Sequence, residues 1–256
     1  MKKITYALAM AVSVFASCTG SYNVQGSSSV SALDGSKLYL KAIKNNELKN
    51  IDSCDVVHGQ FNFNGTLDTV RMVNLFMDDQ SIMPMVLEEG EITIKIDNAS
   101  QKVSGTPLNE KLYDFLDKHN RLDNQMNELA HKQSQMMLDG IDEDEINQKL
   151  SIEAAQIAKE EDKLVTSFIV DNFDNVLGPG VFFMVTIGYR YPELTPWIED
   201  IMSKATDKFK NDPYVKDYYK KAQENQAIMN GMKTPEPAMS APAQGPTPNE
   251  LAAPAQ

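Results

Sequence analysis

Short runs in which apolar and polar residues alternate fill the chain from residue 22 to about residue 105. Turn-forming pairs such as Asp34-Gly35 and His58-Gly59 separate these runs at nearly regular intervals. Alternation with a period of two is typical of strands that bury one face. Each run therefore predicts one short strand. The residues expected on the buried faces are Leu38, Leu40, Ala42, Phe61, Phe63, Val73, Leu75, Met77, Ile92, Ile94 and Ile96.

Strands of this length and spacing predict an antiparallel β-sandwich or a barrel over residues 18–106. The pair Asn64-Gly65 is expected to form a tight hairpin turn, because both residue types tolerate a positive φ. Helices are expected after this region. The predicted fold class is therefore α+β.

The apolar period changes after Gly105, where spacings of four and three begin to alternate. This is the seam of a long amphipathic helix, formed by Leu108, Leu112, Phe115, His119, Leu122, Met126, Leu129, Gln133 and Met136. Asp139-Gly140 is expected to end this helix. A second stripe follows, formed by Ile146, Leu150, Ile157, Leu164 and Phe168. Two such helices with a short connection predict an antiparallel hairpin, in which His119 is a polar residue of the seam.

Shorter elements complete the helical region, which is expected to span residues 107–230. An apolar segment covers Val181 to Ile187, and helices are expected near Thr195 to Ala205 and Pro213 to Met229. Pro213 suits the first turn of a helix, where its missing N–H costs little. Proline and alanine dominate residues 231–256, which have no apolar period, so these residues predict a disordered tail.

The N-terminus has the features of an export signal. Lys2 and Lys3 precede an apolar stretch that is too short to span a bilayer, and Ala16-Ser17-Cys18 resembles the lipobox of bacterial lipoproteins. We expect a signal peptide over residues 1–17, lipidation of Cys18 and a periplasm-facing position on the outer membrane. Phe15 occupies a position where leucine is usual, which leaves an ordinary signal peptidase site as the alternative.

The charge of the chain limits its partners. Its net charge of −12 becomes −14 without residues 1–17, which contain two lysines and no acidic residue. Such a charge repels nucleic acid. The expected partners are the membrane, through the lipid anchor, and an envelope protein.

Metal and cofactor chemistry is not expected. The acidic run from Asp139 to Glu145 lacks the ligand spacing of a calcium loop. Asp142 and Glu145 are instead expected to cap the second helix. His119 and His131 lie about 18 Å apart along one helix and cannot share a metal within one chain. The 14 methionines are scattered through the strands and the seam, which favours core packing over copper binding.

Cys54 is the only thiol that remains once Cys18 is lipidated. The chain can then form neither an internal disulfide nor a CxxC pair. His58 would lie about 13 Å away along a strand, too far to activate the thiol. We interpret Cys54 as a half-buried strand residue. A redox thiol is the weaker alternative, and an intermolecular disulfide stays open.

Aromatic residues are densest near the C-terminal helices. We expect them to close the core there, and their alternative role is to line a hydrophobic cleft for a ligand or partner. The residues concerned are Phe182, Phe183, Tyr189, Tyr191 and Trp197.

Several blocks of residues resemble, in their order, the uncharacterised β-rich domain that precedes the thioredoxin-like domain in lipid-anchored bacterial thiol–disulfide oxidoreductases. The blocks are Tyr22-x-Val24-x-Gly26, Asp34-Gly35 with Leu38-Tyr39-Leu40, Ile51-Asp52-Ser53, Gly59-x-Phe61-x-Phe63-x-Gly65, Leu87-Glu88-x-Gly90-x-Ile92 and Ser104-Gly105-Thr106-Pro107-Leu108-Asn109. The later helices resemble the segment that leads into the thioredoxin domain. The resemblance implies no catalytic residue, and the Pro/Ala-rich segment stands where the CxxC-bearing domain would follow.

Three classes of function are consistent with these observations. The leading hypothesis is a non-enzymatic envelope lipoprotein that binds a partner protein or peptide. The second is a redox accessory that works with a separate thioredoxin-like oxidoreductase. The third is a periplasmic chaperone or small-ligand carrier that uses the helical hairpin and the aromatic residues.

Overall fold

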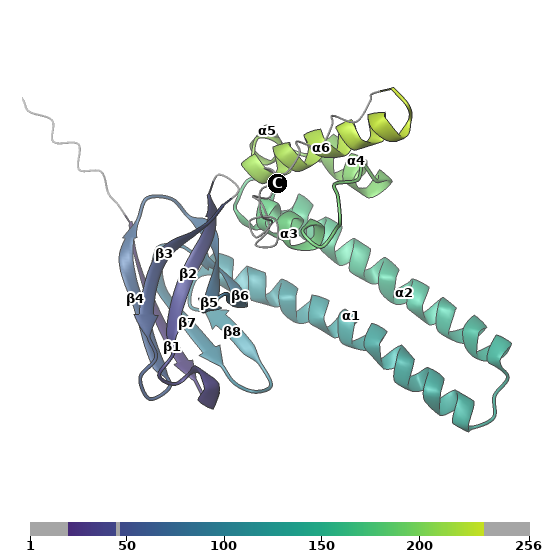
Figure 1. Cartoon of the computed structure of the whole chain (residues 1–256), viewed down its shortest axis with the longest axis horizontal. Helices are drawn as coiled ribbons and strands as arrows, with labels where there is room; N and C mark the ends of the chain where they lie inside the picture. The colour runs from purple at the N-terminus through teal and green to yellow at the C-terminus, as the bar shows by residue number, and fades with distance from the viewer. Residues whose placement is uncertain (1–19, 45–46, 233–256) are drawn as a thin grey trace, which may run out of the picture. The chain divides into compact units, whose positions relative to one another are not determined.

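Two four-stranded sheets form the N-terminal part of the protein (Figure 1). The structure is a computed structural model, and it describes residues 20–44 and 47–232. In those residues the strand orders are β4-β1-β7-β8 and β3-β2-β5-β6. The strands are β1 (Gly20–Ser28), β2 (Lys37–Lys44), β3 (Glu47–Asp55), β4 (Gln60–Leu67), β5 (Arg71–Met77), β6 (Gln80–Leu87), β7 (Gly90–Ile96) and β8 (Gln101–Ser104).

The two sheets are separate layers that enclose a common core, so the sandwich is found and not the barrel. The most buried side chains alternate along the strands as predicted, and those at most 1% exposed include Val24, Phe63, Ile94, Leu40, Leu75 and Met85. One pairing departs from the antiparallel expectation, because β1 and β7 run parallel. The register shifts between Leu75 and Phe76. Phe76 is therefore buried, whereas Met77 is only half-buried.

The prediction of a tight hairpin turn at Asn64-Gly65 was wrong, and two-residue turns of this kind lie at His58-Gly59 and Asp78-Asp79. His58 has a φ of 52° and Gly59 a φ of 71°, and the two flanking residues exchange backbone hydrogen bonds of 2.9 and 3.0 Å. Asn64 and Gly65 lie inside β4, paired with β1. A Cβ at Gly65 would come within 2.5 Å of the Tyr22 hydroxyl oxygen. Close packing, not a turn, therefore requires glycine at this position.

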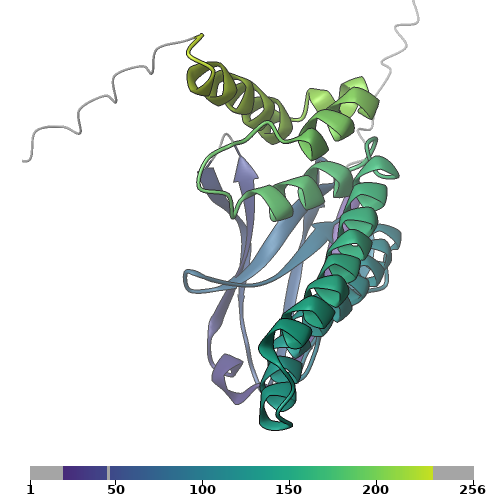
Figure 2. The same cartoon turned by 90° about the vertical axis from the view of Figure 1, so that its right-hand side faces the viewer.

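Helices follow the sandwich, as the change of period predicted. They are α1 (Pro107–Leu138), α2 (Glu143–Val170), α3 (Leu177–Thr186), α4 (Pro196–Lys204), α5 (Asp207–Lys210) and α6 (Pro213–Met229). α1 and α2 run side by side as a hairpin, which confirms the prediction from their two apolar stripes (Figure 2). The single turns α5 and η1 (Ser31–Leu33) were not predicted, because elements this short show no period.

The described residues divide into two compact units between Phe182 and Phe183, inside α3. The predicted boundaries, with a β domain over residues 18–106 and a helical region over residues 107–230, stay a prediction. The hairpin belongs to the same unit as the sandwich. The second unit has a core of its own, and its fully buried residues are Ile198, Ile201, Phe209, Val215 and Ala222.

Some of the sequence-based predictions fall outside the described residues. These are the signal peptide over residues 1–17, the lipidation of Cys18 and the tail from residue 233 onward. Within residues 20–44 and 47–232, no helix combines the length and apolar character needed to cross a membrane.

Candidate functional site

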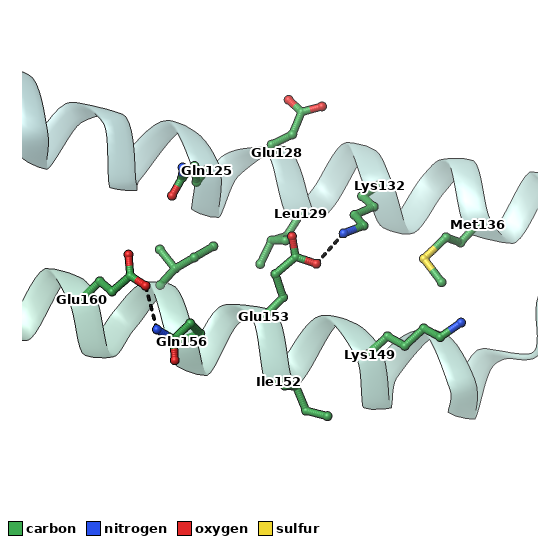
Figure 3. Close-up of a pocket in the computed structure, with 11 residues that line it drawn as sticks. Gln125, Glu128, Leu129, Lys132, Met136, Lys149, Ile152, Glu153, Gln156 and Glu160 are labelled. Carbon is green, nitrogen blue, oxygen red and sulfur yellow. Dashed lines mark hydrogen bonds and ion pairs between the residues drawn. The ribbon is translucent and has the colours of Figure 1, made fainter.

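A groove runs along one face of the hairpin, which we call the arm (residues 107–170) (Figure 3). The groove has a volume of about 960 Å³. Both helices of the arm contribute its lining. The lining residues are Gln125, Glu128, Leu129, Lys132 and Met136 from α1, and Lys149, Ile152, Glu153, Gln156, Ile157 and Glu160 from α2.

The floor of the groove is apolar and belongs to the thin core of the arm. Leu129 and Ile157 contribute to both the floor and this core, and they are 9% and 7% exposed. All members of the core come from α1, α2 and their connection: Leu129, Ile146, Leu150 and Ile157, with Leu122, Met126, Met136, Ile141 and Ala154 packed against them. The core is therefore one seam between two helices, and the groove lies along one side of this seam.

Charged and polar side chains border the floor. Lys132 of α1 forms an ion pair with Glu153 of α2 across the groove. Figure 3 shows Glu128 extending from α1 away from α2, and Ile152 extending from α2 away from α1. Ile152 is 67% exposed although it is apolar. These border residues were not predicted from the sequence, because they lie beside the apolar seams and not within them.

Local signals determine where the arm turns. The Ile141 N–H donates to the Met136 carbonyl at 3.1 Å, and the Gly140 N–H donates to the Met137 carbonyl at 3.1 Å. This pair of bonds is a Schellman motif, which ends α1 where Asp139-Gly140 predicted. Asp142 caps α2 by accepting from the Asp144 N–H at 3.0 Å. The Glu145 side chain does not return to the Asp142 N–H, as the predicted capping box requires. It forms an ion pair with Lys149 at 2.6 Å instead.

A seam residue also links the two helices near the sandwich. His119 Nε2 lies 3.1 Å from Glu161 Oε1 on α2, and the Phe115 ring packs 4.3 Å from the Phe168 ring between centroids. His119 therefore contributes a polar cross-link to an otherwise apolar seam. Since such a pair forms in only one alignment of the helices, it favours the observed register.

A buried polar cluster attaches the base of the arm to the sandwich. The Asn109 carboxamide accepts from the Val86 N–H at 2.8 Å and donates to the Val86 carbonyl at 2.8 Å and to Thr106 Oγ1 at 2.9 Å. Glu88 Oε1 accepts from the N–H groups of Leu108 and Asn109, at 2.9 and 3.1 Å. Glu88 thus caps the first turn of α1 from another element, where a negative charge is favourable. Asn109 is fully buried.

The same contacts cover an open sheet edge. β6 lies at the end of its sheet, where unpaired backbone groups would otherwise be exposed. The Asn109 carboxamide forms hydrogen bonds with the backbone N–H and carbonyl of Val86. The Tyr113 hydroxyl donates to the Pro84 carbonyl at 2.9 Å. Burial raises the pKa of Tyr113, and the charge of Asp117 raises it further, so the phenol stays a neutral donor. α1 therefore serves as the cover of this edge.

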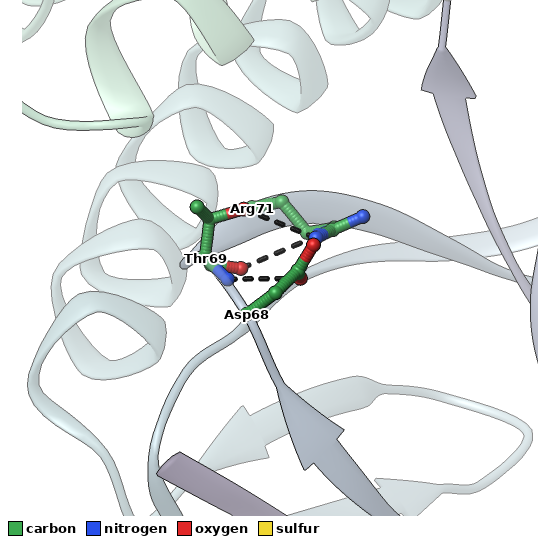
Figure 4. A network of polar contacts seen from close by, with 3 residues as sticks. All are labelled: Asp68, Thr69 and Arg71. Atoms are coloured by element: carbon green, nitrogen blue, oxygen red, sulfur yellow. Dashed lines mark hydrogen bonds and ion pairs between the residues drawn. The ribbon is translucent and has the colours of Figure 1, made fainter. Parts of the chain in front are cut away.

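A second polar network stabilises the connection from β4 to β5 (Figure 4). Arg71 forms an ion pair with Asp68, and its Nη2 donates to Thr69 Oγ1 at 3.0 Å. The hydrogen bond from Arg71 lowers the pKa of Asp68, and the bond from the Thr69 N–H lowers it further. Every partner belongs to one turn that carries the chain between the sheets. We therefore interpret this network as structural.

Cys54 lies in β3 as predicted and is half-buried and free. Burial raises the pKa of its thiol to about 11. The N–H of Asn62 opposes this shift, whereas the charges of Asp52 and Asp55 add to it. His58 occupies the hairpin turn beyond the end of the strand. A raised pKa disfavours the thiolate, which is the reactive form.

Native Cys54 is accordingly expected to react slowly with iodoacetamide at neutral pH. A pKa of about 11, against 9.0 for an ordinary thiol, leaves about a hundredfold less thiolate at pH 7. The rate should rise with pH toward this pKa, and urea should remove the protection. The variant Cys18→Ala leaves Cys54 as the only thiol and makes the measurement unambiguous. Fast alkylation of the folded protein at pH 7 would instead indicate a redox thiol.

The five aromatic residues predicted near the C-terminal helices differ in their surroundings. Phe182 is fully buried in the first unit, and the other four residues lie in the second. Phe183 packs edge-on against Tyr214, with 4.7 Å between ring centroids. Tyr189 and Tyr191 are about half exposed, at 51% and 48%, whereas Trp197 is half-buried. A ligand cleft at these residues stays a prediction.

Comparison with known families concerns the sandwich and the start of the arm. Residues 22–112 match a family model described as a domain of unknown function, DUF4369. This range runs from β1 into the first turns of α1 and includes Glu88 and Asn109. No curated protein matches the chain.

Proposed function

We propose that this protein is a lipid-anchored, non-enzymatic protein of the cell envelope that binds a partner protein through its arm. The proposal rests chiefly on one observation: the core of the long arm is a single seam, and a groove lined by residues of both helices lies along it. A helix pair of this kind gains stability when a further apolar surface covers the seam. The anchor would hold the arm near partners in the envelope.

The properties of the thiol support a binding role over a redox role. The redox hypothesis requires an accessible thiolate at Cys54, and the pKa of about 11 opposes its formation. The match to a domain of unknown function supplies no catalytic residue to consider.

The anchor is tested by replacing the lipidated residue. Cys18→Ala should release the protein from membranes, because its acyl chains supply the membrane affinity. Radiolabelled palmitate should enter the unchanged protein and the control variant Cys54→Ala, but not Cys18→Ala. A soluble and unlabelled parent protein would contradict the anchor and favour an ordinary secreted protein.

Partner binding is tested by photo-crosslinking in intact cells. A photoreactive amino acid at Gln125 or Gln156, both in the groove, should give a discrete heterologous adduct. The same amino acid at Asn124 or Gln148 is the matched control, since these exposed positions of the arm do not line the groove.

The pattern of adducts decides the outcome. Adducts at the groove positions alone would support a binding arm. Equal adducts at all four positions, or none at any, would contradict it. A thioredoxin-like oxidoreductase as the captured partner would add the redox-accessory role to the binding function.

A further inference from the structure

The distal half of the arm presents apolar side chains that its own thin core leaves exposed. Ile152 borders the groove and is 67% exposed, and Met137 and Leu138 at the tip are 50% and 88% exposed. Leu129 and Ile157 in the floor retain small exposed fractions. Of the three well-exposed side chains, Ile152 lines the groove and can contact a protein that lies along it.

The groove has the dimensions of a helix-binding site. From Gln125 to Met136 its α1 wall is about 16 Å long, or about three helical turns. Two helices that leave an apolar seam between charged borders form the acceptor of a three-stranded coiled coil. An amphipathic helix can lie along such a seam with its apolar face on Leu129 and Ile157.

The charge of the arm indicates the character of that helix. Residues 121–160 contain nine acidic residues and four basic residues. Two of these basic residues already form ion pairs within the arm, Lys132 with Glu153 and Lys149 with Glu145. The charged residues that line the groove are Glu128, Lys132, Lys149, Glu153 and Glu160. Because both lysines are paired, Glu128 and Glu160 have no cationic partner among the described residues. A helix in the groove therefore meets these two carboxylates, which favours lysine and arginine beside its apolar stripe.

The same charge argues against a second copy of this chain in the groove. A second arm would bring the same acidic excess against the first, and like charges across an interface are unfavourable. We infer that the occupant of the arm groove is a basic amphipathic helix of a different protein. This inference rests on the proposed binding function and specifies the chemistry of its partner.

The test uses two designed helical peptides of about three heptads. Both carry leucine at the core positions, and they differ in having lysine or glutamate at the flanking positions. Fluorescence anisotropy with the full chain should show binding of the lysine peptide and at least about tenfold weaker binding of the glutamate peptide. Added salt should weaken the binding of the lysine peptide.

Matched charge reversals distinguish binding in the groove from general electrostatic attraction to the arm. The variant Glu128→Lys/Glu160→Lys changes two groove residues and should weaken binding of the lysine peptide at least about tenfold. The variant Asp114→Lys/Asp162→Lys makes the same change of charge at exposed arm positions outside the groove. It should weaken binding by less than about twofold, because these charges are more distant and screened.

Three results would overturn the inference. The first is equal binding of both peptides or of neither, and the second is an equal effect of both double variants. The third is self-association of the chain through the groove, measured by sedimentation and altered by Glu128→Lys/Glu160→Lys. A heterologous crosslink at Gln125 or Gln156 in cells without any preference for the lysine peptide would overturn this inference alone. The proposed binding function would then stand.

Discussion

Asn109→Leu is expected to destabilise the first unit by about 3 kcal/mol or more. Leucine has the same branched shape and the same number of side-chain heavy atoms as asparagine, so the loss does not come from a cavity. It comes from the Val86 N–H and carbonyl, which lose their partners at 2.8 Å in a fully buried place. Each buried group left without a hydrogen bond costs about 1–3 kcal/mol. Urea unfolding followed by circular dichroism measures the loss.

Two further variants make this prediction specific. Asn124→Leu, on an exposed position of the same helix, should change the free energy of unfolding by less than about 0.5 kcal/mol. Asn109→Asp keeps an acceptor for the Val86 N–H but places a carboxyl group near Glu88. Burial and this like charge raise the pKa of the introduced carboxyl. The loss in free energy of unfolding of Asn109→Asp should therefore grow as the pH rises from 4 to 7. A loss below about 1 kcal/mol for Asn109→Leu would show that the cluster does not hold the arm.

Gly105→Ala is expected to cost about 3 kcal/mol or more. Gly105 connects β8 to α1 with a φ of +96°, a conformation that a residue with a side chain rarely adopts. A Cβ there would also lie 2.5 Å from the Glu91 carbonyl oxygen. Both the strain and the clash involve the backbone, so rotation of a side chain cannot relieve them.

Gly35→Ala separates the two contributions to this cost. Gly35 has a φ of +76°, and among the described residues nothing lies within 4 Å of a Cβ built there. Its substitution carries the backbone strain alone and should cost about 1–2 kcal/mol. Equal losses for the two variants would mean that the chain moves away from Glu91 at little cost.

These two positions bear on function because both lie at the base of the arm. Asn109 and Gly105 set where α1 leaves the sandwich, and the groove lies farther along the same helix. A variant that weakens the attachment of α1 to the sandwich without unfolding the sandwich should therefore change the positions that the arm can adopt. The photo-crosslinking pattern is the measurement that would register such a change.

The local patterns of the sequence were sufficient to predict most of the secondary structure. Strands with one buried face follow from alternation, as Phe61 and Phe63 show, and the arm follows from stripes such as Leu122, Met126 and Leu129. Period and turn chemistry involve neighbouring residues, so a single sequence contains them. The same locality explains the wrong turn at Asn64-Gly65, because the packing of Tyr22 on Gly65 involves a residue far along the chain.

The candidate site was predictable only in part. The seam residues Leu129, Met136 and Ile157 were identified, but the border residues Glu128 and Ile152 were not. Which side of a helix pair stays open depends on what the rest of the chain covers. Periodicity within each helix does not contain that information.

The sequence by itself determined the class of the fold, the order of strands and helices, and the interpretation of Cys54 as a strand residue. The tertiary structure alone decided the parallel pairing of β1 with β7 and the division inside α3. It alone also assigned Asn109 its role, since in the sequence this residue is one polar side chain beside a seam. The physical reason is that partners such as Val86 and Asn109 are distant in sequence, and only the folded path of the chain brings them together.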